Sequence, residues 1–162
     1  MADAATMTIK AVLLPDEIQT TLKDLTFSYT PVNDDDKWFY GIVNVPHNTG
    51  DEDLISGTFM SNNAGIATGS TTATISTSDK VKFLFIKNSD ATDSLYLAID
   101  GGTAAHNYAN VIEVGPGESW FAKLTNTTVG NLHANNGGPN AADAGDASIQ
   151  CIVAAMLDDV SE

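Results

Sequence analysis

The sequence predicts an all-β protein, an antiparallel β-sandwich with a jelly-roll-like topology. Short apolar runs and alternating polar and apolar residues recur along the whole chain, and both patterns are typical of strands. Turn signals rich in Gly, Pro, Asn and Asp separate the runs, which gives about eight to ten short strands and almost no helix. A β-barrel is the second architecture that this spacing allows. No repeat of fixed period is visible, which argues against propellers and solenoids.

The chain has the size expected of one domain, residues 1–162. Its apolar fraction of 43% can fill a core, and a domain of this size needs no disulfide or metal for stability. Residues 1–14 are expected to form either an N-terminal arm or an edge strand of the sandwich.

Five strands are expected in the first half of the chain. Segment 25–29 alternates apolar and polar residues, and 38–45 is an aromatic and β-branched run closed by a proline. Residues 16–23 form either one helical turn or a plain connection, whereas 47–53 and 61–71 are polar, loop-like stretches. The expected strands span residues 8–14, 25–29, 38–45, 54–60 and 72–77.

The second half carries the clearest strand pattern. Segment 81–87 is apolar on both faces, as in a central strand covered on each side, and 95–99 is expected to be its return strand. The turn Gly115-Pro116-Gly117-Glu118 lies between 111–114 and 119–124, which form either a hairpin or a strand with a sharp corner. Further strands are expected at 131–134 and, with Ile149, Cys151, Val153 and Leu157 on one face, at 147–157.

The charge balance excludes several classes of partner. The chain has 21 acidic and 7 basic residues, a net charge of −14, and all seven basic residues are lysines. Arginine is the preferred residue for bidentate contacts to phosphates and bases, and a strongly negative chain is repelled by nucleic acid. The same repulsion acts at an anionic membrane surface. We therefore expect neither nucleic acid nor membrane as a partner.

No targeting or membrane segment is evident in the sequence. Residues 1–10 lack a basic region followed by an apolar stretch, so no signal peptide is expected. No window approaches the roughly 18 consecutive apolar residues of a membrane helix. The single cysteine, Cys151, lies in an apolar run and is expected to be a small buried strand residue rather than a nucleophile.

The residues that could carry chemistry do not assemble into one site. His47, His106 and His133 are isolated from one another, whereas metal sites usually show close ligand pairs, such as the His-x-His of cupin enzymes. No serine lies in a nucleophile elbow, and neither Gly pair has the context of a phosphate loop. We therefore expect no enzyme activity, no cofactor and no resident metal.

Two acidic clusters, 34–36 and 51–53, leave one alternative open. Hard cations such as calcium favour carboxylate ligands, but neither cluster matches the EF-hand calcium loop. Adjacent carboxylates in loops are ordinarily solvated charge runs. Solvation is the preferred interpretation, and cation binding in one of these loops is the alternative.

Aromatic residues gather in two places and are the candidate interface residues. On an alternating strand, Trp38 and Tyr40 face one way and Phe39 the other. Such residues serve as core, as a protein interface or as a platform for a sugar. The candidate set is Trp38, Phe39, Tyr40, Trp120 and Phe121.

The stretch from Val81 to Leu157 resembles structural proteins of tailed-bacteriophage virions. It contains an apolar strand, the turn Asp100-Gly101-Gly102, the turn Gly115-Pro116-Gly117-Glu118, and a final apolar strand, in the order found in capsid decoration (cement) proteins with a jelly-roll fold. The resemblance covers roughly half of the chain and rests on turn chemistry.

The resemblance implies a non-enzymatic protein on the exterior of a phage capsid. Such proteins bind the major capsid protein, bridge neighbouring subunits and are often homotrimers, so a homo-oligomer is expected, with a trimer favoured. It also implies that residues 1–14 act as an arm that adds a strand to a neighbour's sheet. The acidic composition suits a position on the outside of the particle, away from DNA.

Two other functional classes compete with this interpretation. A tail or fibre protein, or a carbohydrate-binding module, would use an exposed Trp38 or Trp120 to stack on a sugar ring. A cupin-like enzyme would require a metal site that departs from the usual motif.

Overall fold

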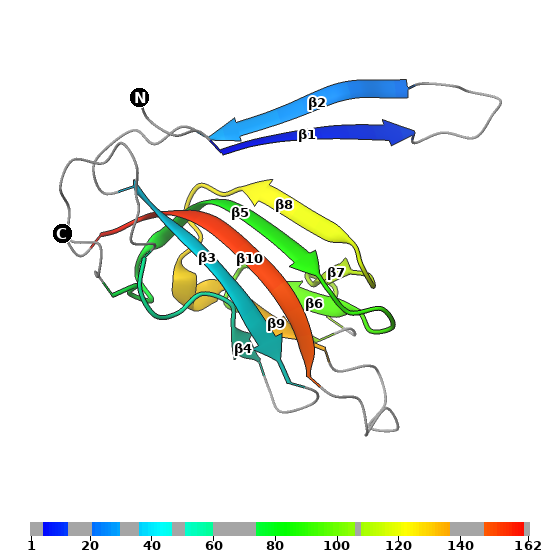
Figure 1. The fold of residues 1–162 in the computed structure, drawn as a ribbon. Helices are drawn as coiled ribbons and strands as arrows, with labels where there is room; N and C mark the ends of the chain where they lie inside the picture. The colour runs from blue at the N-terminus through cyan, green and yellow to red at the C-terminus, as the bar shows by residue number, and fades with distance from the viewer. Residues whose placement is uncertain are drawn as a thin grey trace.

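The computed structural model describes residues 5–12, 21–29, 36–46, 51–59, 74–105, 108–136 and 148–160 (Figure 1). These residues form ten β-strands and one 3₁₀ turn, Val129–Asn131. The strands are β1 (Ala5–Val12), β2 (Thr21–Tyr29), β3 (Asp36–Val45), β4 (Glu52–Asp53), β5 (Lys80–Asn88), β6 (Leu95–Ala98), β7 (Ile112–Val114), β8 (Ser119–Lys123), β9 (His133–Asn135) and β10 (Ile149–Asp158).

Strands β3 to β10 build a sandwich of two four-stranded antiparallel sheets. The first sheet has the order β3-β10-β5-β8 and the second the order β4-β9-β6-β7. The pairs β3–β10, β4–β9, β5–β8 and β6–β7 are nested, so the chain behaves like one long hairpin rolled into two layers. This is the jelly-roll arrangement. The predicted fold class is therefore confirmed.

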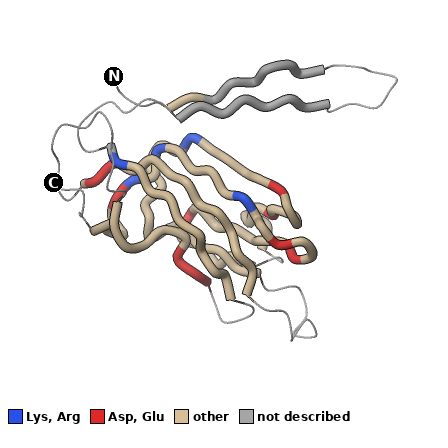
Figure 2. Tube along the Cα trace, viewed as in Figure 1, with Lys and Arg blue, Asp and Glu red and all other residues tan. Residues whose placement is uncertain are grey.

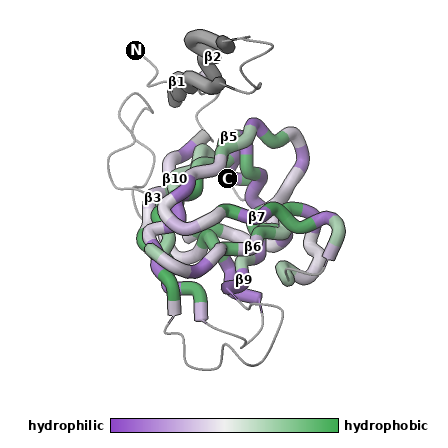
Figure 3. The backbone as a smooth tube through the Cα atoms, turned by 90° about the vertical axis from the view of Figure 1, so that its right-hand side faces the viewer, coloured by the Kyte–Doolittle hydropathy of each residue, from purple (hydrophilic) through white to green (hydrophobic). Residues whose placement is uncertain are grey.

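The core lies between the two sheets. The first sheet contributes Leu84 and Ile86 of β5 and the alternate residues of β10, and the second contributes Leu95 and Leu97 of β6. All of them pack into one cluster, as expected when the inner faces of two sheets meet. Figure 3 shows hydrophobic stretches on strands of both sheets. The buried residues of β10 are Ile149, Cys151, Val153, Ala155, Met156 and Leu157, of which Met156 faces away from this core.

The expected hairpin between 81–87 and 95–99 is wrong. Strand β5 lies in the first sheet and β6 in the second, so the intervening turn crosses from one layer to the other. The buried Asn88 supports this crossing, because its side-chain amide donates to the carbonyl oxygens of Asp93 (2.7 Å), Val114 (3.1 Å) and Gly115 (3.2 Å). Turn residues alone do not distinguish a hairpin from such a crossing.

The turn at residues 115–118 is the sharp corner rather than a hairpin. Strand β7, before it, belongs to the second sheet, and β8, after it, to the first. The Glu118 amide donates to the Gly115 carbonyl at 3.0 Å, and Gly117 has a φ of 70°. Glycine with positive φ after proline is what a type II turn requires.

Three other local expectations are corrected. The acidic loop expected at 47–53 contains the short strand β4, whereas 54–60 and 72–77 contribute only the isolated bridge between Thr58 and Thr74 in their described parts. Leu54 and Ile55 are both buried, but the chain bends there and neither residue belongs to a strand. A helical turn reaching residue 23 is excluded, because Thr21–Tyr29 is a strand, and residues 13–20 lie outside the described ones.

Strands β1 and β2 form a separate two-stranded antiparallel sheet, the β1–β2 ribbon, which Figure 1 draws above β5 and β8. Its register sets Met7 opposite Phe27 and Thr8 opposite Thr26, so apolar and polar pairs alternate along it. In the described part of the chain, β1 pairs with β2 and with no strand of the sandwich. The expected arm at 1–14 therefore coincides with β1 over its described residues, 5–12.

Candidate interaction surface

The outer face of the first sheet is the side turned away from the core. Directly opposite residues on neighbouring strands share a face of a sheet, so the strand register defines this side. It runs across four strands in three rows. The rows are Trp38, Met156, Phe83 and Lys123; Tyr40, Ala154, Phe85 and Phe121; and Ile42, Ile152, Lys87 and Ser119.

This outer face is unusually apolar. An antiparallel sheet with one face on the core ordinarily turns a polar face to water. Here nine of the twelve positions are apolar or aromatic, so the first sheet is apolar on both sides, as the pattern at 81–87 predicted for its central strand. A contiguous apolar surface of this kind marks a contact with another surface.

One end of the outer face is covered within the chain. Tyr29, the last residue of β2, packs with Trp38 and Phe85 against Phe83 and Met156, which are 5% and 0% exposed. The Lys123 ammonium lies 6.0 Å from the centroid of the Tyr29 ring, within the range of a cation–π contact. The end of the β1–β2 ribbon is thus anchored on the first sheet.

The other end of the outer face remains open. Tyr40 and Ile42 of β3 are 55% and 62% exposed, and Ile152 beside Ile42 is half-buried. Exposed polar residues surround them, namely Asn44, Gln150 and Lys87. We call Tyr40, Ile42 and Ile152 the open patch. Because they retain this exposure with Tyr29 in place, they are the part of the outer face that is free to contact a partner.

Charge is unevenly divided between the two sheets. All five lysines of the sandwich lie on strands of the first sheet, Lys37 on β3, Lys80, Lys82 and Lys87 on β5, and Lys123 on β8 (Figure 2). The strands of the first sheet also carry Asp36 and Asp158. The strands of the second sheet carry Glu52, Asp53 and Glu113 and no lysine. Lys37 is buried against Asp159, and Lys82 pairs with Asp158. The outer face itself is therefore apolar with two exposed cations, Lys87 and Lys123, on a chain whose net charge is −14.

The structure divides the five candidate interface residues between the two sides of the first sheet. Trp38, Tyr40 and Phe121 lie on the outer face. Phe39 is 7% exposed in the core, and Trp120 is partly buried and packs against the same core cluster. Tyr40 is the most exposed of the five, and the role of each in binding stays a prediction.

Sequence reasoning missed Ile42, Ile152, Phe83 and Phe85 as members of this surface. Their signal was present in the alternation of β3 and in the two apolar faces of β5. The residues on the outer side could not be separated from core residues, because period-two alternation gives two faces but does not say which one is covered.

His133, the one histidine among the described residues, contacts a backbone carbonyl and lies near a carboxylate. Nδ1 of His133 lies 3.1 Å from the Gly102 carbonyl oxygen and 3.9 Å from Oδ2 of Asp51. Oδ1 of Asp51 accepts a hydrogen bond from the Ala104 amide at 3.0 Å. These contacts tie the loop after β6 to β9 and β4. His47 and His106 lie outside the described residues.

Cys151 and the acidic clusters are the remaining candidates for reactivity and metal binding among the described residues. Cys151 is fully buried, and desolvation raises the pKa of its thiol to about 12, so the reactive thiolate is scarcely populated. In the described part, no three His, Cys, Asp or Glu side chains are grouped to hold a metal ion. Asp34 and Asp35 of the first acidic cluster lie outside the described ranges.

A buried ion pair joins the start of β3 to the end of β10. Nζ of Lys37 lies 2.7 Å from Oδ2 of Asp159, and the two side chains are 2% and 0% exposed. The Phe59 ring lies 5.4 Å from the same ammonium. Asp79 is also buried here, and its carboxylate accepts from the amides of Ser76 (2.8 Å) and Val160 (3.2 Å). Burial raises the pKa of Asp79, against the lowering effect of these two hydrogen bonds.

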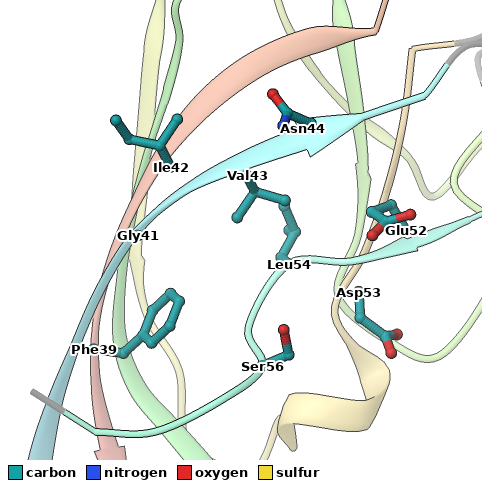
Figure 4. A pocket seen from close by; sticks show the side chains of 9 residues that line it. All are labelled: Phe39, Gly41, Ile42, Val43, Asn44, Glu52, Asp53, Leu54 and Ser56. Atoms are coloured by element: carbon teal, nitrogen blue, oxygen red, sulfur yellow. The ribbon is translucent and has the colours of Figure 1, made fainter.

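A pocket of about 400 Å³ opens at the edge of the sandwich, between β3 and β4 (Figure 4). Both strands are the outermost of their sheets, so the pocket lies where the two layers end. Phe39, Val43 and Leu54 are its apolar lining residues, and the acidic residues Glu52 and Asp53 of β4 also line it.

Comparisons with protein-family models, with curated proteins and with solved structures gave no match. Among the described residues, no helix is long and apolar enough to cross a membrane. The functional inference therefore rests on the sequence and on the surface described above.

Proposed function

We propose that this chain is a non-enzymatic virion structural protein, which binds the outer surface of a phage capsid and stabilises it by bridging major capsid subunits. The open patch is the observation that carries this proposal. Tyr40 and Ile42 stand more than half exposed on a regular sheet, where soluble domains ordinarily place polar residues. The choice of a phage capsid as the partner comes from the resemblance of residues 81–157 to capsid decoration proteins.

The patch fits a role in adhesion rather than in turnover. Full burial of a large apolar side chain contributes about 1.5–3 kcal/mol, so covering the exposed halves of Tyr40 and Ile42 contributes roughly 2 kcal/mol. One such contact is weak. A trimer that engages three equivalent sites would bind far more tightly, because linked contacts act as one multivalent interaction.

The division of charge gives the bound protein an orientation. The first sheet, with the open patch and the lysines, faces the capsid, and the acidic second sheet faces solvent. This orientation predicts that the contacted capsid surface is apolar with acidic residues at its margin.

Co-sedimentation with purified phage capsids tests the proposal. We expect the wild-type chain to sediment with particles and to raise their melting temperature. The double variant Tyr40→Lys/Ile42→Lys should lose at least about tenfold in affinity, because about 1.4 kcal/mol is one factor of ten. Tyr108→Lys is the matched control, since Tyr108 is 50% exposed and lies outside the outer face.

Two results would count against this function. The first is a chain that never sediments with capsids and has no effect on their melting. The second is sedimentation that the Tyr40 and Ile42 substitutions leave unchanged. A glycan array separates the carbohydrate-binding alternative, for which Trp38→Ala should abolish binding. Trp120 is a poor platform for a sugar, because it packs against the core.

A further inference from the structure

In the part of the sandwich that the structure describes, β3 forms the one long edge strand. Edge strands are ordinarily kept short or protected by lysine, proline or a bulge, because their free backbone groups pair with other chains. The other three edge strands of the sandwich, β4, β7 and β8, have two, three and five residues. Strand β3 has ten.

Among the described residues, none of the usual protections is present along most of β3. It pairs with β10 over its whole length without a register shift, and residues 38–45 contain neither lysine nor proline. Within the described part of the chain, residues 39–45 pair with β10 on one side and with no strand on the other. A strand could therefore be added to the first sheet at this edge.

The pocket lies where the inward side chains of an added strand would point. A strand placed beside β3 would direct every second side chain toward the second sheet, into the space between β3 and β4. Figure 4 shows that Phe39, Val43, Leu54 and Ser56 surround this space. The Phe39 ring packs directly against Gly41. A side chain at position 41 would collide with this ring, since its Cβ atom would lie only 2.9 Å from Cζ of Phe39.

The lining of the pocket indicates which side chain it accepts. Phe39, Val43 and Leu54 make part of its wall apolar, whereas Glu52 and Asp53 on β4 line it at the side of the second sheet. Of these two consecutive residues, Glu52 lies on the core side, opposite the buried Ala134. An aliphatic stem that ends in a cation matches this combination, because lysine and arginine bury their methylene groups and keep their charge at a polar rim. The net charge of −14 also attracts a basic segment from a distance.

We propose that β3 is a strand-addition site for an extended basic segment of a partner protein, whose lysine or arginine side chain enters the pocket between β3 and β4. Backbone pairing along β3 supplies affinity, and the pocket supplies specificity. This inference rests on the proposed function only for the identity of the partner, which would then be a capsid subunit.

A pair of synthetic peptides tests the site without any capsid. The first is an end-capped nonapeptide of alternating threonine and valine with a central lysine, and the second has glutamate in place of lysine. Titration of the full ¹⁵N-labelled chain with the lysine peptide should shift the amides of residues 39–45 and 52–56. The glutamate peptide should bind several-fold more weakly, because it replaces the attraction between lysine and Glu52 by a repulsion.

Two variants and one control test whether the peptides bind at the pocket between β3 and β4. Glu52→Gln/Asp53→Asn should remove the preference for lysine over glutamate, and Ser56→Phe, at an exposed position, should fill the pocket and weaken both peptides. Glu113→Gln is the control, because Glu113 lies on β7, the opposite edge of the same sheet. Equal binding of both peptides to the wild type, or shifts away from β3 and β4, would overturn the inference.

The outcomes separate this inference from the proposed function. If capsid binding depends on Tyr40 and Ile42 but neither peptide binds at β3, the capsid role stands and the edge site falls. If the lysine peptide binds at β3 but no capsid is bound, the edge site stands and its partner lies elsewhere.

Discussion

The buried ion pair between Lys37 and Asp159 should be one of the strongest single contacts in the sandwich to disrupt. Its atoms are 2.7 Å apart, and both side chains are almost fully excluded from water. Lys37→Met removes the cation and leaves the Asp159 carboxylate buried without it, beside the buried Asp79. Loss of one partner of a buried pair costs about 3–5 kcal/mol, which would be a large part of the stability of a domain of this size.

Urea denaturation followed by tryptophan fluorescence measures the cost, because Trp38 and Trp120 both pack against buried clusters. Lys82→Met is the matched control. Lys82 lies 2.9 Å from Asp158, but these side chains are 24% and 22% exposed, so its loss should cost no more than about 1 kcal/mol. The double variant Lys37→Met/Asp159→Leu should recover most of the loss, since apolar residues often replace a buried pair at little cost.

A cost of Lys37→Met below about 1 kcal/mol, or equal to that of Lys82→Met, would refute the assignment of this pair as a buried structural contact.

Four further outcomes are expected. Asn88→Ala should destabilise by at least about 2 kcal/mol, because three carbonyl oxygens lose their donor; urea titration measures this. Gly117→Ala should cost about 1 kcal/mol, since its φ of 70° is unfavourable for alanine although no atom lies near the added Cβ; thermal melting checks it. The folded-state pKa of Asp79 is raised, so its favourable contribution is complete below the unfolded value of 3.8 and is lost as the pH rises through the folded pKa. Wild type should therefore gain stability relative to Asp79→Asn as the pH is lowered from 7 toward 4. Cys151 should resist thiol reagents at pH 8 in the folded protein and react at once in urea, because it is buried with a pKa of about 12.

Three of these outcomes have a specific result that would contradict them. An Asn88→Ala variant as stable as wild type would mean that water replaces the amide at the crossing between the sheets. Equal pH profiles for wild type and Asp79→Asn would place Asp79 in solvent. Labelling of Cys151 at the same rate with and without urea would show that β10 opens freely.

Local sequence determined much of this fold. The alternation from Ile149 to Ala155 shows which residues of β10 face the core, and Pro116 followed by Gly117 specifies the turn between β7 and β8. Both features depend on neighbours within a few residues, and the physical constraints on them act locally: side chains alternate along a strand, and positive φ favours glycine. The apolar character of the outer face was also visible at 81–87.

Only the tertiary structure decided which strands pair and which apolar face stays open. Strand β5 pairs with β10 and β8, not with the next strand in sequence, and the two-residue β4 exists because β9 lies beside it. Ile42 and Val43 are both apolar neighbours, yet Ile42 is 62% exposed and Val43 packs against the core. Pairing and coverage depend on segments far away along the chain, and a period of two residues carries no information about them.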